Sequence, residues 1–596
     1  MDSCVDDQAS RWISLLLCLM MVMAPAMGVP SEEMLQDTLK SAIVSLFSLN
    51  AGLLFFWLHR GKTTTLVWHG LLWLPLALVV YACTSMAWSH TYLAGVEAVR
   101  WFIFSLILWL CLNTRLADLE TRLLWGIHLG VSLASVWTAM QFLNDFPLFP
   151  QGPNPASTFV NRNFFAEFAI CALPYSVYLL MGSSSNRRAF GLAASIGLNL
   201  AALMMTGTRS ALIALLFLAP VLLVLYARNR KQLEIFAWNR RKALFTGLIV
   251  VMTTLVLGLI PNENPKLISE FGPLNAITRA TGRTLSMARP DEYTTGSFSI
   301  RSVMWVATGR MIAANPLIGV GAGAWEVQSP LYQRAGTQLE TDFYAHNEFL
   351  QLLAEYGVVG WLFLGLLFSY LAYSAKKTWE VPQDLGQQPV LLRGTVLASI
   401  FMLLIVSNAG FPWRMASTGA LFALSLGLLA ASDVSLGLRW RLLTSYIRCK
   451  VASVKMAFVI GMVCMALAIY ITQRAAYCER ILVRGIKLAL TISKSGNPNH
   501  PYWNPVKEEV VALMRSGISM NRHYRKLTPM AADEMASWGD WKNALWIWES
   551  VLESRPNVVA VIANISRAYL EGGNLPQAEK YLERAQRLQP TAPAVR

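Results

Sequence analysis

A histidine stands just before a long apolar run, at the end of the polar segment 261–351. The stretch Tyr344-Ala345-His346-Asn347-Glu348 is followed by Glu355-Tyr356-Gly357 and then by apolar residues. Histidine is the side chain best suited to proton transfer near neutral pH, and long connecting loops are often functional. We therefore treat His346 as a candidate catalytic residue that accepts or steers a proton.

Two arginines stand at positions that suggest anion binding. Arg209 lies in the turn 206–210 between two apolar runs, and Arg301 opens an amphipathic stretch that ends at Asn315-Pro316. A guanidinium is a planar donor fork that suits phosphate. Such an arginine also has a simpler interpretation, in which its head group reaches the membrane surface. Beside His346, we interpret Arg209 and Arg301 as catalytic and donor-binding residues.

Two further segments are weaker candidates. Asn161-Arg162-Asn163 precedes an apolar run, where it either caps a helix or contacts a ligand through Arg162 and Asn163. The segment 317–323 is a turn with glycines at 319, 321 and 323. Its glycines either expose backbone amides to an anion or have a structural role.

The composition is that of a protein that crosses a membrane many times. The chain has 596 residues, of which 55% are hydrophobic and 14% charged, too apolar for a soluble protein of this size. Thirteen apolar runs are long enough to cross a hydrocarbon core of about 30 Å as helices. They cover residues 12–28, 41–58, 66–86, 97–112, 123–143, 165–182, 190–206, 210–227, 243–260, 352–375, 391–407, 415–432 and 455–473. The expected fold is an all-α, polytopic helical bundle.

The basic residues are concentrated in alternate loops of the chain. The formal net charge of +15 would suit nucleic-acid binding, but these residues fill alternate short loops, among them 60–62, 187–188 and 228–242. Because positive loops stay in the cytoplasm, this pattern argues against nucleic acid and fixes a topology. The N-terminus is expected inside, and the loop 261–351 and everything after residue 474 are expected outside.

The cysteines and the first apolar run add little. The eight cysteines show no spacing typical of zinc or of a disulfide framework, so we interpret them as packing residues. The run 12–28 is either a signal peptide or a retained helix. Asp2, Asp6 and Asp7 do not fit the positive start of a signal peptide, which favours a retained helix.

The C-terminal part contains an internal repeat. Gly539, Ala544 and Pro556 recur 34 residues later as Gly573, Ala578 and Pro590. A 34-residue period with small residues at helix crossings resembles the tetratricopeptide repeat, and an ordinary helical hairpin is the alternative. The segment 500–535 is expected to add irregular helices that cap the stack.

Several common catalytic motifs do not occur in the sequence. No loop expected outside carries an Asp-x-Asp pair for a metal, and the nearest cluster, Asp342, His346 and Glu348, lacks a convincing ligand set. There is no Walker motif, no Gly-x-Ser-x-Gly and no dinucleotide fingerprint. The arginines and histidine therefore predict transfer from a substrate already activated as a lipid diphosphate. Arginines would stabilise the leaving diphosphate, and the histidine would take the proton of the attacking hydroxyl.

The segment from Arg301 to Gly360 resembles the O-antigen ligase superfamily of bacterial membrane glycosyltransferases. The closest matches are the glycine turn at 315–323 and His-Asn-Glu-Phe-Leu-Gln-x3-Glu-Tyr-Gly at 346–357, and segments 159–166 and 206–210 are also similar. The resemblance implies about twelve spans in an inner membrane, with a long periplasmic loop between the ninth and tenth. It also implies that Arg209 and Arg301 bind undecaprenyl diphosphate, that His346 is catalytic or orients the acceptor, and that no metal or other cofactor is needed.

The chain departs from the simple ligases after residue 432, so four parts are expected. They are an N-terminal span (1–40), the ligase-like core with its loop (41–432), a cytoplasmic loop with a last span (433–474), and a periplasmic tetratricopeptide-like domain (475–596). The last part raises the chance of a protein partner or a protein acceptor. The acceptor stays open between lipid A core, protein serine or threonine, and a growing polysaccharide. A transporter of lipid-linked sugar and a non-catalytic scaffold are the alternatives from other classes.

Overall fold

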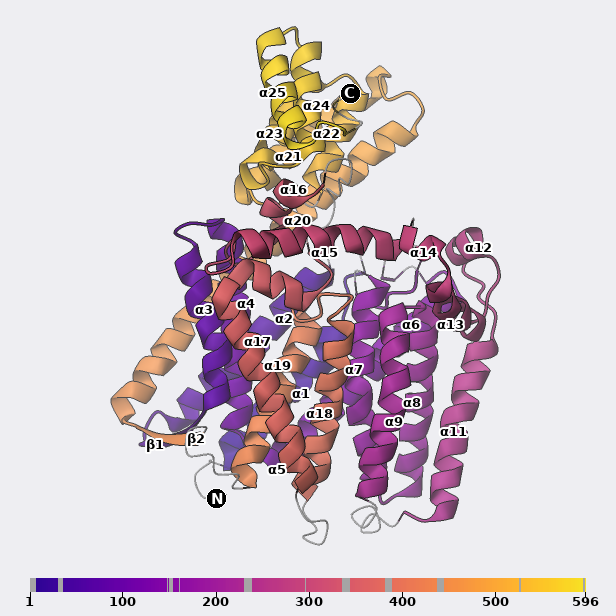
Figure 1. Cartoon of the computed structure of the whole chain (residues 1–596), viewed down its shortest axis with the longest axis vertical. Helices are drawn as coiled ribbons and strands as arrows, with labels where there is room; N and C mark the ends of the chain where they lie inside the picture. The colour runs from indigo at the N-terminus through magenta and orange to yellow at the C-terminus, as the bar shows by residue number, and fades with distance from the viewer. Residues whose placement is uncertain are drawn as a thin grey trace.

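The computed structural model describes residues 7–30, 36–146, 148–149, 154–159, 161–229, 238–294, 296–334, 344–380, 388–436, 444–524, 527–592 and 595. These residues form a bundle of long helices that carries short helices and a separate helical domain at one end (Figure 1). Eleven of the described helices are long and apolar enough to cross a membrane. Two shorter apolar helices, Gly70–Ser85 and Val390–Val406, stand at the third and eleventh predicted spans. The all-α polytopic fold is therefore confirmed.

Of these eleven long and two shorter apolar helices, nine precede the long loop, in the order expected from the sequence. They are α1 (Asp7–Ala26), α2 (Gln36–His59), α3 (Trp73–Ser85), α4 (Thr91–Leu112), α6 (Leu124–Leu143), α7 (Arg162–Met181), α8 (Asn186–Thr206), α9 (Arg209–Arg228) and α11 (Arg240–Leu259). The short α5 (Leu116–Asp118) and one π-helical turn (Leu119–Leu123) lead into α6.

The loop is itself helical, and four more long helices follow it. The loop contains α12 (Pro265–Phe271), α13 (Ala276–Leu285), α14 (Asp291–Thr294), α15 (Ser297–Ala314) and α16 (Trp325–Tyr332). After it come α17 (Glu348–Glu380), α18 (Gln388–Val406), α19 (Ala416–Ser435) and α20 (Val451–Lys494). The loop thus stands between the ninth and tenth long helices of the described chain.

The third predicted span was wrong at its start. Residues 66–69 belong to β1 (Thr64–His69), which pairs antiparallel with β2 (Thr444–Cys449). Threonine, valine and tryptophan favour strands, and Asn113 bonds both backbone groups of Val67, at 2.8 and 3.1 Å. The helix can begin only after this ladder ends.

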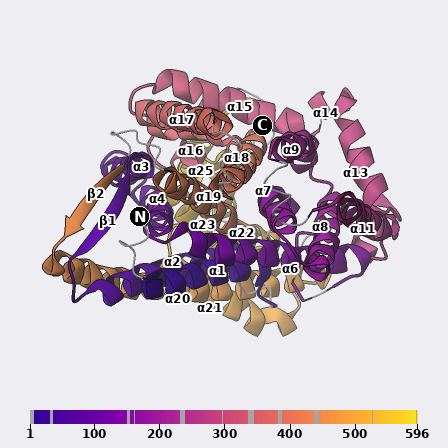
Figure 2. The same cartoon turned by 90° about the horizontal axis from the view of Figure 1, so that it is seen from below.

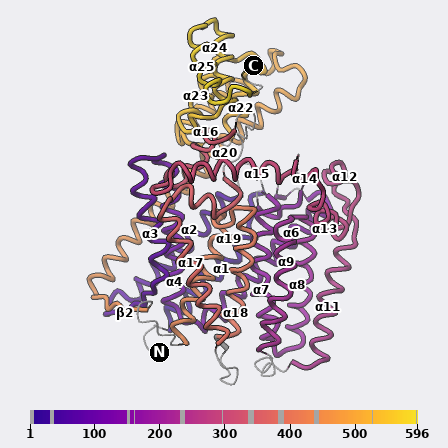
Figure 3. The backbone as a smooth tube through the Cα atoms, in the orientation of Figure 1, coloured from indigo at the N-terminus to yellow at the C-terminus, as the bar shows by residue number. Residues whose placement is uncertain are grey.

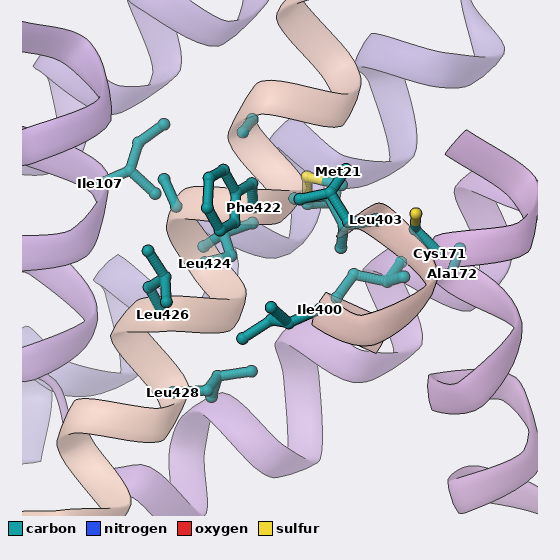
Figure 4. Packing of buried hydrophobic residues seen from close by; sticks show 14 of the residues in the cluster. Met21, Ile107, Cys171, Ala172, Ile400, Leu403, Phe422, Leu424, Leu426 and Leu428 are labelled. Carbon is teal, nitrogen blue, oxygen red and sulfur yellow. The ribbon is translucent and has the colours of Figure 1, made fainter. Parts of the chain in front are cut away.

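The centre of the bundle is α19, which packs against α4, α18, α2 and α7 (Figure 2). Its leucines and Phe422 meet apolar side chains from α1, α4, α7 and α18 (Figure 4). Cys111 and Cys171 are buried in this core, and all seven described cysteines are free thiols. The positions of Cys111 and Cys171 fit the predicted packing role, whereas Cys83 is exposed.

The two ends of the bundle differ. The N-terminus and the sheet lie at one end, whereas α12–α16 and the C-terminal domain lie at the other, with α15 running across it (Figure 1). The loop 261–351 and the residues after 474 therefore share an end, as the charge pattern predicts. The side of the membrane that this end faces stays a prediction.

The expected boundary at residue 475 falls inside a continuous helix. α20 has 44 residues, about 66 Å at 1.5 Å per residue, and runs from β2 into the C-terminal domain (Figure 3). It continues because Cys478, Leu482, Ile486 and Ala489 recur at helical spacing and enter the core of that domain.

The C-terminal domain adds five helices to the end of α20. They are α21 (Asn504–Met520), α22 (Thr528–Ser537), α23 (Trp541–Ser554), α24 (Val559–Glu571) and α25 (Leu575–Leu588). Gly539 and Gly573 both have positive φ, 84° and 75°, and the residues after them, Asp540 and Asn574, cap α23 and α25. The 34-residue offset thus relates two hairpins with the same turn geometry. The tetratricopeptide assignment stays a prediction.

Candidate functional site

Five arginines gather at the end of the bundle that carries the loop. Arg162 begins α7, Arg209 begins α9, and Arg279 and Arg283 lie one turn apart on α13. Arg301 lies on α15, one turn after its first residue. Arg162, Arg209 and Arg301 were predicted from the sequence, whereas the two arginines of α13 were not.

A glycine turn allows the arginines of α13 to approach α9. Gly207 has a φ of 61°, a left-handed conformation that favours glycine. A Cβ there would stand 3.1 Å from Nε of Arg279 and 3.2 Å from Cγ of Arg283, and Arg283 Nε donates to the Gly207 carbonyl at 3.4 Å. The arginines of α13 therefore pack directly on the short turn between α8 and α9.

Arg209 is paired with a carboxylate of the loop. Its two terminal nitrogens donate to the two oxygens of Glu292 on α14, with Nη2 at 2.7 Å from Oε2. They also donate to Ser286 at 2.9 Å and to Ser297 at 3.2 Å. Both charged side chains are only about 15% exposed, so Arg209 binds an anion here rather than extending into solvent.

The segment 161–163 caps a helix, which is one of its two predicted roles, and its contact with a ligand stays a prediction. The side chain of Asn161 accepts from the backbone of Asn163 and caps α7. Asn163 accepts from Thr208 at 3.1 Å, which ties the start of α7 to the turn before α9. Arg162 donates to Asn154 at 2.8 Å, and Arg279 donates to the same amide oxygen.

The cluster carries an excess of positive charge at close quarters. Burial, and then the charge of Arg283, lower the pKa of Arg279 to about 10. Burial, followed by the charge of Arg209, lowers the pKa of Arg283, with a further contribution from Arg301. Each guanidinium would be stabilised by a nearby anion. The cluster binds one carboxylate, Glu292, and a second, Glu270, acts on Arg162 and Arg279, so the arrangement suits an anion site.

Helix α15 connects this cluster to the histidine. Its first residue, Ser297, accepts from Arg209, and Arg301 follows one turn later. One further turn on, Trp305 Nε1 donates to the Ala345 carbonyl at 3.1 Å, next to His346. The structure therefore places Arg209, Arg301 and His346 around one end of one helix.

His346 has an unusual backbone conformation. Its φ is 51°, a left-handed value that costs a non-glycine residue about 1–3 kcal/mol and often marks functional sites. Its ring packs on Phe411 at 5.0 Å, and Phe411 also meets Phe164 in the first turn of α7 at 5.1 Å. Asn347 caps α17, because its side chain accepts a hydrogen bond from the Leu350 backbone at 3.1 Å.

The rest of the histidine signature builds a buried ion network around Arg414. Arg414 donates to Glu355 at 2.7 Å, to Glu97 at 2.7 Å and to Glu348 at 3.4 Å. Burial alone would lower the pKa of Arg414, but these three carboxylates outweigh burial and raise it. Gln351, on the same face of α17, bonds Glu355 and the Ala345 backbone, each at 2.9 Å. The network thus fixes the loop that ends at His346.

The glycine turn 317–323 has the structural role. Val320 and Gly321 donate to carbonyls of Ala354 and Glu355, and Val358 donates back to Leu317. Gly357 breaks the helical path of α17 with a φ of 53°, and a Cβ at Gly319 would meet the Glu355 carbonyl at 2.5 Å. These amides are used by the kink of α17, so the anion-binding alternative is wrong.

A buried carboxylate on α7 also lies near the site. Glu167 is 1% exposed, faces the backbone at Gly410, and lies within electrostatic range of Glu348 and Arg301. Glu167 was not predicted from the sequence. An acidic residue within an apolar run, five residues after Arg162, was the available signal.

No metal-ligand set of three or more His, Cys, Asp or Glu occurs among the described residues. Asp342, part of the weak acidic cluster considered from the sequence, lies outside them. Independence from metal remains a prediction.

The two missed arginines had a recognisable signal. Arg279 and Arg283 are spaced four residues apart on a strongly amphipathic segment, so they share one face of a helix. That face could not be assigned to the site without knowing that α13 rests on the turn at Gly207.

Comparison with known proteins supports a family for the central region. Residues 194–365 match the model of the family described as O-antigen ligase. This range contains Arg209, Arg279, Arg283, Arg301 and His346, and Arg162 precedes it. A search of curated proteins finds no match.

Proposed function

We propose a specific reaction for this protein, whose residues 194–365 match the O-antigen ligase family and support a membrane glycosyltransferase. It moves a preassembled glycan from undecaprenyl diphosphate to an acceptor hydroxyl at the periplasmic face of a bacterial inner membrane. The observation that carries the proposal is the cluster of five arginines beside His346, with Glu292 bound in the fork of Arg209.

The arginines suit the leaving group. A diphosphate presents several oxygens to planar donor forks, and Arg209, Arg279, Arg283 and Arg301 approach from three different helices. As the bond between the anomeric carbon and the diphosphate oxygen breaks, the electron pair stays on that oxygen. Fixed positive charges stabilise this developing charge without reorganisation.

The histidine suits the acceptor. The acceptor oxygen forms the new bond to the anomeric carbon and gives up its proton, which His346 takes or directs. Its ring lies on Phe411 rather than within the arginine cluster. That position suits contact with the incoming hydroxyl more than with the phosphates.

We also propose a role for each part of the chain. Residues 41–432 form the transferase with the loop 261–351 over its periplasmic end, residues 1–40 form an extra span, and residues 433–474 return the chain to that end. Residues 475–596 act on the acceptor or on a protein partner. The acceptor is lipid A core, a protein hydroxyl or a growing polysaccharide.

The test is donor binding by purified full-length protein in nanodiscs, measured with undecaprenyl diphosphate. Arg283→Ala and Arg209→Ala should each weaken binding by about tenfold or more, since a charge-assisted contact contributes about 1.5–3 kcal/mol. Arg209→Lys should recover only part of the loss, because an ammonium lacks the bidentate fork.

Arg289→Ala is the matched control, because Arg289 belongs to the same loop but is exposed. Equal loss in Arg289→Ala would mean that the loop attracts the donor by general charge. Unchanged binding in both Arg283→Ala and Arg209→Ala would contradict the proposed donor site.

A further inference from the structure

A cavity of about 400 Å³ lies apart from the arginine cluster. It is lined by α2, α4 and α19 of the bundle, by α20, and by residues 521–524 of the C-terminal domain. Its volume is in the range of sites that bind small ligands, about 300–1,000 Å³. None of the five clustered arginines lines it.

The C-terminal domain is fixed in place at the rim of this cavity. The His523 ring stacks on Tyr92 at 4.7 Å with an interplanar angle of 21°, and Asn521 donates to the Tyr92 hydroxyl at 3.2 Å. Thr38 on α2 donates to Glu479 on α20 at 2.7 Å. The cavity is therefore built jointly by the membrane part and the added domain.

The lining is acidic on balance. It includes four carboxylates, Asp37, Glu97, Glu326 and Glu479, against the guanidinium groups of Arg100 and Arg414. Arg414 is already surrounded by three carboxylates, and Arg100 is paired with Glu97. A phosphate or a uronate would meet like charge here, which disfavours such ligands.

The polar and apolar groups of the wall suit an uncharged polyhydroxyl compound. Carboxylates only accept hydrogen bonds, so a sugar hydroxyl can donate to those in the wall. Val96, Ile103 and Phe104 also belong to the wall and can contact the apolar faces of the sugar.

The cavity also approaches the histidine. Tyr344 and Arg414 belong to its wall, and the Tyr344 ring packs on Phe411 at 4.3 Å. His346 packs on the same Phe411 ring. One aromatic ring thus separates the cavity wall from the residue assigned to the acceptor hydroxyl.

We propose that this cavity is the acceptor site and that it takes an uncharged sugar at the end of the acceptor. The inference rests on the proposed transferase function and narrows its substrate class. The positively charged arginine cluster binds the donor diphosphate, whereas the carboxylates of the cavity repel a phosphorylated acceptor. A peptide acceptor is disfavoured, because extended peptides dock on sheet edges or long grooves and this wall is a compact cavity between helices.

Binding of short oligosaccharides tests the site without requiring transfer. The probes are neutral hexose and N-acetylhexosamine oligosaccharides, the same compounds carrying phosphate, and Ser/Thr-containing peptides, each offered to full-length protein in nanodiscs. We expect neutral oligosaccharides to bind and their phosphorylated forms to bind about tenfold or more weakly. Binding of phosphorylated compounds alone, of peptides alone, or of no probe up to about 10 mM would overturn the proposal.

Variants of α4 locate the binding. Val96→Trp and Val99→Trp fill the cavity from positions that are 40% and 54% exposed, so the fold should tolerate them. Each should weaken neutral oligosaccharide binding by about tenfold or more, whereas Phe102→Trp, on the same helix but outside the wall, should not. Unchanged binding in both cavity variants, or equal loss in Phe102→Trp, would contradict the assignment.

Undecaprenyl diphosphate binding, measured on the same samples, separates the two hypotheses. Its retention in Val96→Trp shows that the variant is folded. If the wild type binds the donor but no saccharide, only the acceptor site is overturned. If the wild type does not bind the donor, the result counts against the proposed function.

Discussion

Glu292 accepts hydrogen bonds from both terminal nitrogens of Arg209, so a carboxylate of α14 fills the guanidinium fork at the centre of the arginine cluster. A carboxylate and a phosphate present similar pairs of oxygens to such a fork. Donor binding at Arg209 must therefore displace Glu292 and move α14, which is joined to α15 and hence to Arg301.

The first prediction follows from this competition. Glu292→Gln should bind undecaprenyl diphosphate more tightly, by about threefold to tenfold, because a neutral amide is a weaker competitor for the guanidinium. Asp291→Asn, a neighbouring exposed change, should have little effect. Donor binding measured in nanodiscs would decide the matter, and weaker binding in Glu292→Gln would show that the pair builds the site rather than blocking it.

The pH dependence of this contact has a defined sign. The hydrogen bonds from Arg209 lower the pKa of Glu292 to about 2, below the unfolded value of about 4.3. The stabilisation from the pair is therefore complete above the unfolded pKa and is lost as the pH falls towards 2. Between pH 5 and 9 the competition should not change, so any titration of donor binding there must come from another group or from the ligand. A wild-type titration in that range that disappears in Glu292→Gln would contradict this.

The second prediction concerns His346. His346→Ala should slow transfer by roughly 10²–10⁴-fold, the usual contribution of general acid–base catalysis, with little change in donor affinity. His346→Asn is the sharper variant, since asparagine tolerates the left-handed backbone found at this position. It should keep the fold and lose the activity. Near-normal transfer by His346→Asn would remove the catalytic assignment.

The sequence predicted the long helices well because each needs a run of apolar residues, which is visible locally. It failed at residues 64–69, where the decisive partner is β2, nearly 400 residues away in the chain. The same limit applies to the site. His346, Arg209 and Arg301 stood out by type and position. Arg283 becomes part of the site only because α13 packs on the turn at Gly207, and Glu292 only because it pairs with Arg209.

The third prediction tests the network that holds the histidine loop. Arg414→Ala leaves Glu97, Glu348 and Glu355 buried without their shared cation, which should cost about 3–5 kcal/mol of stability. Thermal unfolding in detergent should show a clear drop in Tm. Arg100→Ala is the control, because Arg100 is 24% exposed and its ion pair among the described residues is with Glu97, so its loss should be smaller. Equal Tm values for Arg414→Ala and the wild type would contradict the assigned role.

The fourth prediction concerns metal removal. The proposed leaving-group stabilisation uses guanidinium groups, so transfer by purified protein should continue in EDTA at the untreated rate. The assay follows glycan transfer from the lipid diphosphate before and after chelation. Loss of activity that Mg²⁺ or Mn²⁺ restores would show that the arginines do not act alone on the diphosphate.

The last prediction concerns orientation. Helices α13 and α24 lie at one end of the molecule and β1 lies at the other (Figure 1). Leu285, which is 69% exposed, ends α13, Ala560 belongs to α24, and the exposed Lys62 lies two residues before β1. In a variant without native cysteines, Leu285→Cys and Ala560→Cys should react with a membrane-impermeant maleimide once the outer membrane is opened. Lys62→Cys should react only after the inner membrane is opened, because positive loops stay inside. Protection of both Leu285→Cys and Ala560→Cys would reverse the orientation and place the arginine cluster in the cytoplasm, away from a periplasmic acceptor. Labelling of only one of the two would contradict the shared end seen in the structure.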